Sequence, residues 1–281
     1  MYYLMIIVSA FLFSTQFLLS NEFRKESGNT WNASLKFSLY SSLFGLPILI
    51  IINGFHLELS AFSVVVAFVY SIVTIALAYS SIKAFLYANL SVYSVIAMIG
   101  GMLLPFVYGV LCGETLTLAR IVCCILIAVC VLMSIHKGES SKKAFKYYIA
   151  VFILNGMIGV ISKFEQSHID LCVDSGSFMV LTKVLSIVLS ALLIAFQKEK
   201  NYRISIKACA YTIMHSLVNS IGNLMLLIAL IHLPASVQYP MVTGGTIVFS
   251  VLISVFAKER ITKKEFIGAA IAFTATLFMM L

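Results

Sequence analysis

Charged side chains are scarce in this sequence. Only 11% of its 281 residues are Asp, Glu, Lys or Arg, whereas 61% are hydrophobic. A soluble domain carries about 25% charged residues, so a single water-facing globule cannot bury this much apolar surface. The shortage excludes a soluble protein, and the apolar stretches that recur along the whole chain predict a polytopic membrane protein.

Sequence signatures of catalysis and of metal binding are also missing. There is no Walker A loop, no HExxH and no GxSxG pattern, which argues against ATP hydrolysis, zinc peptidase chemistry and serine hydrolase chemistry. The six cysteines form no CxxC pair and no cluster with histidine, so neither a zinc site nor a disulfide framework is indicated. We expect no enzymatic activity, no cofactor and no bound metal.

Acidic residues are the minority among the few charges. The chain has 19 Lys and Arg against 11 Asp and Glu, a net charge of +8. The basic residues lie mostly in short connections between apolar stretches, where they set membrane topology, so we do not expect nucleic acid as a partner. By the positive-inside rule, the Lys-rich connections face the cytosol and both termini lie outside the cell membrane.

Ten stretches are long enough to cross a bilayer, since a spanning helix needs roughly 20 apolar residues. A backbone in lipid must satisfy its hydrogen bonds internally, so these stretches are expected to be helices. The expected spans cover approximately residues 1–20, 31–53, 60–82, 87–111, 116–135, 145–166, 177–196, 207–231, 234–257 and 264–281. The expected fold class is therefore an all-α integral membrane protein with ten transmembrane helices.

The two halves of the chain resemble one another. Residues 84–117 fall on residues 229–262 without a gap. Identical pairs in this alignment include Ala84 with Ala229, Gly100 with Gly245, Glu114 with Glu259 and Thr117 with Thr262. We expect two five-helix repeats, 1–138 and 145–281. An odd number of spans in each half inserts the halves with opposite orientations, which is typical of secondary transporters.

This organisation resembles the drug/metabolite transporter superfamily, and most closely its EamA-type members. The motifs GVLCGETLTLAR at 109–120 and SVFAKERITKKEFIGAAI at 254–271 match the family's Glu-x-(Leu/Ile)-Thr turn before the last helix of each half. Lys36 and Lys183 match a basic residue that the family often carries early in the second helix of each half. The resemblance implies a substrate cavity between the halves, lined by the first, third and fourth helices of each. Ten-span members usually keep both termini in the cytosol, the reverse of the orientation that the charges predict.

The expected span 207–231 carries a polar stripe. Tyr211, His215, Asn219 and Asn223 recur every four residues and so share one face of a helix. Polar groups are costly against lipid, so this face either lines a cavity or bonds a neighbouring helix, and we favour the cavity. His215 is either a proton relay or a neutral hydrogen-bond partner.

The ninth expected span combines polar and helix-weakening residues. Pro240 lacks an amide donor and kinks or opens the turn before it, while Gly244 and Gly245 allow a bend or a close helix approach. We predict a hinge at these three residues, with Gln238 and Tyr239 binding substrate at the break. The alternative is a proline kink with small-residue packing and no ligand.

Three charged residues within the expected spans need partners. Lys36 and Lys183 are costly in lipid unless they are paired, and Glu165, Glu22 and Glu26 are candidate partners. We interpret Lys36, Lys183 and Glu165 as structural charges. The predicted substrate site comprises Asn219, Asn223, His215, Gln238, Tyr239, Asn155 and Gln16.

The first span has no carboxylate, and its middle offers Ser14, Thr15 and Gln16. A buried cation without a counter-charge is costly, which argues against proton-coupled export of lipophilic cations. We predict a secondary transporter of a small polar, amino acid-like neutral or zwitterionic metabolite, with a proton or sodium as coupling ion left open. The alternatives are a flippase with a headgroup site at Lys36 and Lys183, a small-molecule drug exporter, and a non-transporting membrane scaffold or binding protein.

Overall fold

The computed structural model describes residues 1–87, 90–114, 142–197 and 203–256, with scattered residues between 117 and 129 and between 263 and 274. Within this part of the chain, every regular element is a helix. The helices are α1 (Tyr2–Ser27), α2 (Trp31–Ile52), α3 (Ala61–Ala84), α4 (Leu90–Leu111), α6 (Lys142–Ser167), α7 (Ser175–Ala195), α8 (Ile206–His232) and α9 (Ala235–Phe256).

All 8 of these helices are long and apolar enough to cross a membrane. Seven of them agree with expected spans to within three residues, and α1 ends seven residues beyond the end of its expected span. The described part of the chain is therefore all-helical and fits a multi-pass membrane protein. The other two expected spans, 116–135 and 264–281, fall largely outside the described residues.

Side-chain caps fix where several helices begin. The hydroxyl of Thr30 accepts a hydrogen bond from the Ala33 amide at the start of α2, and Ser205 does the same at the start of α8. Asp174 accepts from two backbone amides at the start of α7. Such caps satisfy amides that have no partner within the helix and typically stabilise it by about 1 kcal/mol.

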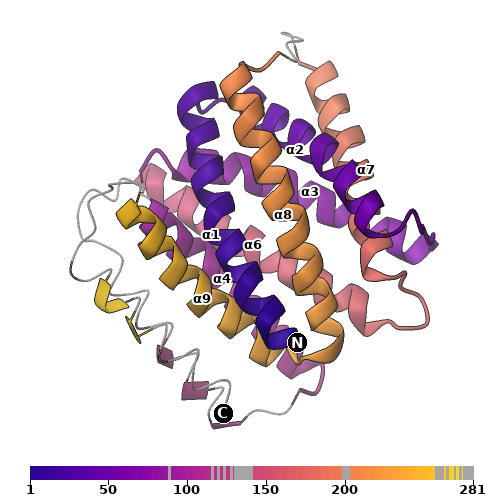
Figure 1. The fold of residues 1–281 in the computed structure, drawn as a ribbon, viewed down its shortest axis with the longest axis vertical. Coiled ribbons are helices and arrows are strands. Elements are labelled where there is room, and N and C mark those ends of the chain that lie inside the picture. The colour runs from indigo at the N-terminus through magenta and orange to yellow at the C-terminus, as the bar shows by residue number, and fades with distance from the viewer. Residues whose placement is uncertain are drawn as a thin grey trace.

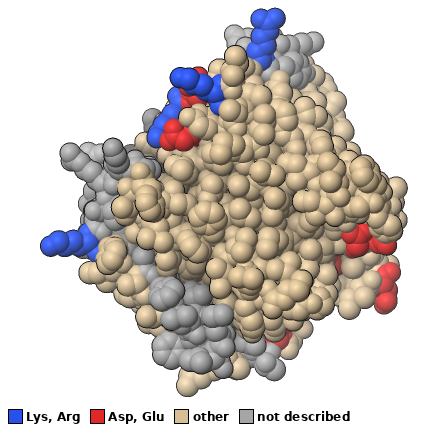
Figure 2. Space-filling model, viewed as in Figure 1, with Lys and Arg blue, Asp and Glu red and all other residues tan. Residues whose placement is uncertain are grey.

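Charged groups gather at the two ends of the helices. Arg24 and Lys25 lie in the last turn of α1, and Lys83 lies in the last turn of α3. Glu58 and Asp174 lie in the connections at the opposite end, before α3 and α7. In Figure 2 a broad surface without Lys, Arg, Asp or Glu separates the charged groups at its edges. An uncharged belt of this kind is what contact with lipid requires.

Helices that are distant in sequence lie side by side, as α1 and α8 do in Figure 1. α1 packs against α8 and α9, α6 packs against α3 and α4, and α2 packs against α7 and α8. α3 also packs against α7, and α4 against α9. The pairings are symmetric between the two sets of helices. If α1, α2, α3 and α4 trade places with α6, α7, α8 and α9 in that order, the same set of pairings results.

Two glycines permit close crossings at corresponding places in the halves. A Cβ at Gly100 of α4 would lie 1.8 Å from the backbone oxygen of Phe152 in α6. A Cβ at Gly245 of α9 would lie 2.9 Å from the Cβ of Ala10 in α1. The first contact involves a backbone that cannot turn aside, whereas the second involves a single methyl group.

We expect Gly100→Ala to destabilise the protein by about 1–3 kcal/mol, because overpacking forces the two helices apart. Gly245→Ala, the matched change in the other half, should cost less. Denaturation of the two purified variants in detergent, followed by circular dichroism, measures both effects. Equal losses, or a larger loss for Gly245→Ala, would contradict this account of the α4–α6 crossing.

Candidate functional site

A central cavity of about 210 Å³ is lined by side chains from all eight helices described above. Its lining includes residues near the middle of their helices, such as Gln16 in α1, Thr74 in α3 and Asn219 in α8. Of the seven predicted substrate-binding residues, the structure brings six to this cavity: Gln16, Asn155, His215, Asn219, Asn223 and Tyr239.

A chain of hydrogen bonds crosses the cavity from α7 to α1. The Nζ of Lys183 donates to Oδ1 of Asn219 at 3.0 Å. The Nδ2 of Asn219 in turn donates to Oε1 of Gln16 at 2.7 Å. Asn223 is held one turn further along α8, where its Nδ2 donates to the backbone oxygen of Asn219 at 2.8 Å. The polar stripe of α8 therefore faces the cavity and joins three helices.

Lys183 differs from the structural charge that the sequence suggested. It lines the cavity, and none of the proposed carboxylates pairs with it in the described structure. Glu165 is fully buried elsewhere, where it accepts a hydrogen bond from Ser63 of α3 at 2.5 Å. Because α6 packs against α3 at this level, Glu165 faces Ser63 and not α7.

Lys36 lies apart from Lys183. Its Nζ donates to the backbone oxygen of Arg203 at 2.8 Å, and it lines a separate small pocket together with Glu26. Glu22, the remaining candidate partner, pairs with Lys25. The two lysines therefore do not form a single basic site.

His215 is buried between α8 and α2 at the wall of the cavity. Its Nδ1 lies 3.2 Å from the hydroxyl of Ser41, and its ring meets the ring of Phe37 edge-on at 4.6 Å. Ser216, the next residue, donates to the backbone oxygen of Ser41 at 2.8 Å. These contacts hold the imidazole in place beside the cavity.

Asn155 and Tyr239 line the cavity on the side of α4, α6 and α9. The Nδ2 of Asn155 donates to the backbone oxygen of Ala97 at 2.7 Å. The Tyr239 hydroxyl donates to the backbone oxygen of Gly159 at 3.0 Å. Both side chains thus bond a neighbouring helix and contribute to the lining at the same time.

Gln238 does not line the cavity, contrary to the sequence prediction. It is 0% exposed, and its Nε2 donates to the backbone oxygen of Leu226 at 2.6 Å. Consecutive residues of an α-helix are rotated by about 100°. In α9 this rotation brings Tyr239 to the cavity and turns Gln238 toward the backbone of α8.

The predicted opened turn at Pro240 is also absent. α9 is a continuous helix from Ala235 to Phe256 with Pro240 inside it. A proline this close to the start of a helix leaves most of the hydrogen bonds of the helix in place. Gly244 is buried, and Gly245 packs closely against Ala10 of α1.

Several lining hydroxyls were not among the predicted site residues. Ser38, Ser41 and Ser42 of α2 and Ser186 of α7 all line the cavity. The three- and four-residue spacing of the α2 serines is a sequence signal for a shared helix face. Serine in apolar helices also commonly bonds neighbouring helices, which is why that spacing alone did not indicate a cavity.

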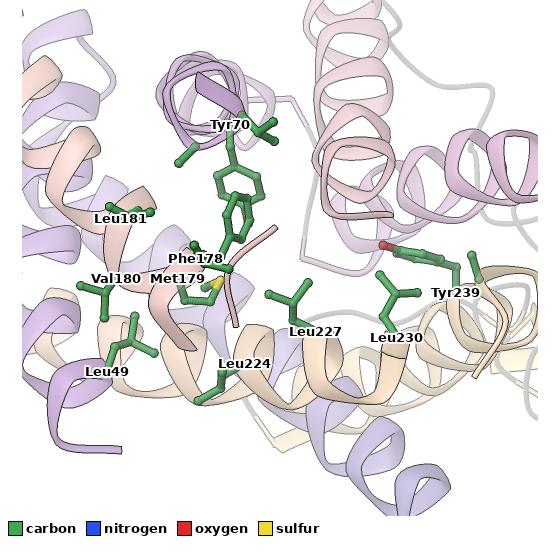
Figure 3. Packing of buried hydrophobic residues seen from close by; sticks show 14 residues of the cluster. Leu49, Tyr70, Phe178, Met179, Val180, Leu181, Leu224, Leu227, Leu230 and Tyr239 are labelled. Carbon is green, nitrogen blue, oxygen red and sulfur yellow. The ribbon is translucent and has the colours of Figure 1, made fainter. Parts of the chain in front are cut away.

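An apolar cluster lies at one end of the cavity, shown in Figure 3. Tyr70 of α3 meets Phe178 of α7 edge-on at 5.9 Å, and both belong to this cluster with Leu227 and Tyr239. The cluster is built from the starts of α3, α7 and α9 and the ends of α2 and α8. It therefore lies between the cavity and the helix ends near Asp174.

Glu114 joins three helix ends beyond this cluster. Its Oε1 and Oε2 accept hydrogen bonds from the amides of Ala235 and Ser236 at 3.0 and 2.9 Å, which caps α9. Lys163 of α6 pairs with the same carboxylate at 2.9 Å. Burial by itself would raise the pKa of Glu114, but these amides and Lys163 outweigh burial and lower it. The sequence places Glu114 in the internal repeat and in a family motif, and neither indicates these contacts.

One group of potential metal ligands lies outside the cavity. Ligand atoms of His56, Glu58 and Asp174 lie within 4.8 Å of one another near the start of α7. Asp174 already caps α7, and Glu58 accepts a hydrogen bond from the Asp174 amide. Because Asp174 and Glu58 fix the connections between helices, we assign this group a structural role.

Comparisons with known proteins extend the description of the fold. No family model matches the chain, and no curated protein matches its sequence. One solved structure, described as "Crystal structure of protein", is similar over 99% of this chain and 96% of its own length, with a TM-score of 0.70 and 14% identity. A likeness at this identity shows the fold alone. Practically the whole chain therefore adopts a fold that a solved structure also shows.

Proposed function

We propose that the chain is a secondary transporter that moves a small polar metabolite across the cell membrane by alternating access, and that it is an EamA-type drug/metabolite transporter. The observation that carries this proposal is the polar cavity at mid-depth between helices that can span a membrane. Polar side chains at that depth are costly and mark solute pathways in membrane proteins.

The arrangement of helices supports the proposed inverted repeat. The helices α1 to α4 and the helices α6 to α9 make corresponding pairings. The close crossings at Gly100 and Gly245 also occupy corresponding places. Transporters with inverted repeats bind substrate near the bilayer midplane between the repeats. A cavity lined by residues near the middle of helices from both sets supports the proposal.

Alternating access needs a cavity that is closed toward one side at a time. The apolar cluster around Phe178 and the contacts of Glu114 join helix ends on one side of the cavity. These contacts are of the kind that closes the cavity toward that side. They would separate when the cavity opens to that side and closes to the other.

The size and charge of the cavity favour a small solute. Its volume of about 210 Å³ lies below the roughly 300–1,000 Å³ of pockets for drug-sized ligands. No Asp or Glu is among its described lining residues, which disfavours lipophilic cations. Lys36 and Lys183 occupy different pockets, which disfavours the shared headgroup site of a flippase.

The test of this proposal is Asn219→Leu, assayed by counterflow in proteoliposomes with a panel of small polar solutes. Asn219 links Lys183 to Gln16, and hydrogen bonds to charged groups contribute about 1.5–3 kcal/mol. We therefore expect the initial rate to fall about tenfold or more while the amount of folded protein stays similar. Asn29→Leu, in the connection between α1 and α2, is the matched control and should transport normally.

Two outcomes would contradict the proposal. Wild-type proteoliposomes that exchange no solute of the panel faster than protein-free vesicles would favour a membrane scaffold. Normal flux in a folded Asn219→Leu variant would show that the solute does not pass through this cavity.

A further inference from the structure

Lys183 is the only Lys, Arg, Asp or Glu among the described residues that line the central cavity. Its side chain is nearly buried, with 9% of the residue exposed. An ammonium group carries three hydrogen-bond donors, and in the described structure one of them has an acceptor, Oδ1 of Asn219. Donors therefore remain for a group inside the cavity.

The surroundings of Lys183 hold the ammonium group at this place. Asn219 is itself fixed by Gln16, so its Oδ1 presents a defined acceptor to Lys183. The absence of a side chain at Gly45 makes room for the lysine stem, since a Cβ there would lie 3.3 Å from Cε of Lys183. A charge positioned in this way costs no further ordering when a ligand arrives.

A buried ammonium group with an amide as its partner is energetically costly. Neutral oxygen acceptors offset only part of the desolvation cost of a cation, whereas an anion at hydrogen-bond distance offsets much more. The described lining supplies no carboxylate for this purpose. A negatively charged group on the ligand would then supply the missing counter-charge.

We propose that Lys183 is the anion-binding group of the cavity and that the transported solute is a small hydrophilic organic acid with one carboxylate. This inference rests on the transport function proposed above and narrows its substrate class. If the solute also carried a positive group, that group would face only amides and hydroxyls, because the described lining has no carboxylate. A solute with a net charge of −1 therefore complements the cavity. Asn155, Asn223 and the serine hydroxyls remain for the neutral polar groups of the acid.

The test compares carboxylates with their uncharged amides. Lactate and lactamide, and acetate and acetamide, differ only at the group that Lys183 would bind, and alanine adds a zwitterion. Thermal shift of detergent-purified protein at constant ionic strength gives apparent affinities for the wild type and for Lys183→Met. Lys36→Met is the matched control. Lys36 lies in α2, the counterpart of α7 in the first half of the chain, but it lines a different pocket.

We expect the wild type to bind the carboxylates about tenfold or more tightly than the amides. Lys183→Met should lose this preference, and Lys36→Met should retain it. No stabilisation by any carboxylate, or a preference that survives in Lys183→Met, would overturn the inference. Counterflow separates the two proposals. Flux of neutral solutes without a carboxylate preference refutes only the inference. Carboxylate binding that depends on Lys183, without flux of any solute, refutes the transport function and leaves the anion-binding role of Lys183 standing.

Discussion

A phenylalanine in place of Thr74 should reduce solute flux by at least about tenfold and leave the fold intact. Thr74 lines the cavity near the middle of α3, and its hydroxyl donates only to the backbone oxygen of Ser71 in its own helix, at 2.9 Å. The substitution therefore breaks no described contact between helices. The added ring would occupy part of a cavity of only about 210 Å³, and solute that must pass through this volume would be excluded.

The measurement is the initial rate of counterflow, normalised to the amount of folded protein from size-exclusion chromatography. We expect a loss of at least about tenfold, equivalent to about 1.4 kcal/mol of binding or barrier. Val69→Phe places the same ring on the exposed face of α3, where Val69 is 42% exposed, and should transport at the wild-type rate. Unchanged flux through Thr74→Phe would place the solute pathway elsewhere.

The helices and one face of the site could be predicted from local sequence. The four-residue spacing of His215, Asn219 and Asn223 places them on one face of α8, and polarity in lipid requires that face to point inward. In the structure all three line the cavity. The helical period and the cost of polar groups in lipid are enough to predict the helices and the inward face of α8, because both act within a single helix.

Contacts between helices could not be predicted in the same way. The charge of Lys183 makes carboxylates its candidate partners, yet the rotation of α7 turns the lysine toward Asn219. The sequence predicts both Gln238 and Tyr239 in the site, but only Tyr239 lines the cavity, because Gln238 bonds the backbone oxygen of Leu226 in α8. Which face of a helix meets which neighbour depends on packing across the bundle, and a single sequence carries little of that information.

Glu114→Gln should destabilise the protein by about 2–4 kcal/mol at neutral pH. The carboxylate of Glu114 caps α9 through two amides and pairs with Lys163. Both side chains are largely buried, with 13% and 17% exposed, so the substitution removes half of a shielded ion pair and weakens the cap. Chemical denaturation in detergent measures the loss. Glu58→Gln is the control. The carboxylate of Glu58 is exposed and accepts a hydrogen bond from the backbone amide of Asp174, so this change should alter the free energy of unfolding by less than about 0.5 kcal/mol.

The pH dependence of this difference tests its electrostatic origin. The backbone amides and Lys163 hold the pKa of Glu114 below its ordinary value of 4.5. A carboxyl group whose pKa is lowered by folding contributes its stability above the pKa of the unfolded chain and loses it as the pH falls through the folded pKa. The gap between wild type and Glu114→Gln should therefore stay constant from about pH 7 to pH 5 and shrink below about pH 4.5. A gap that is independent of pH over this whole range would mean that Glu114 acts by packing and not by charge. In that case Glu114 would hold this end of the bundle by packing, as the apolar cluster around Phe178 does.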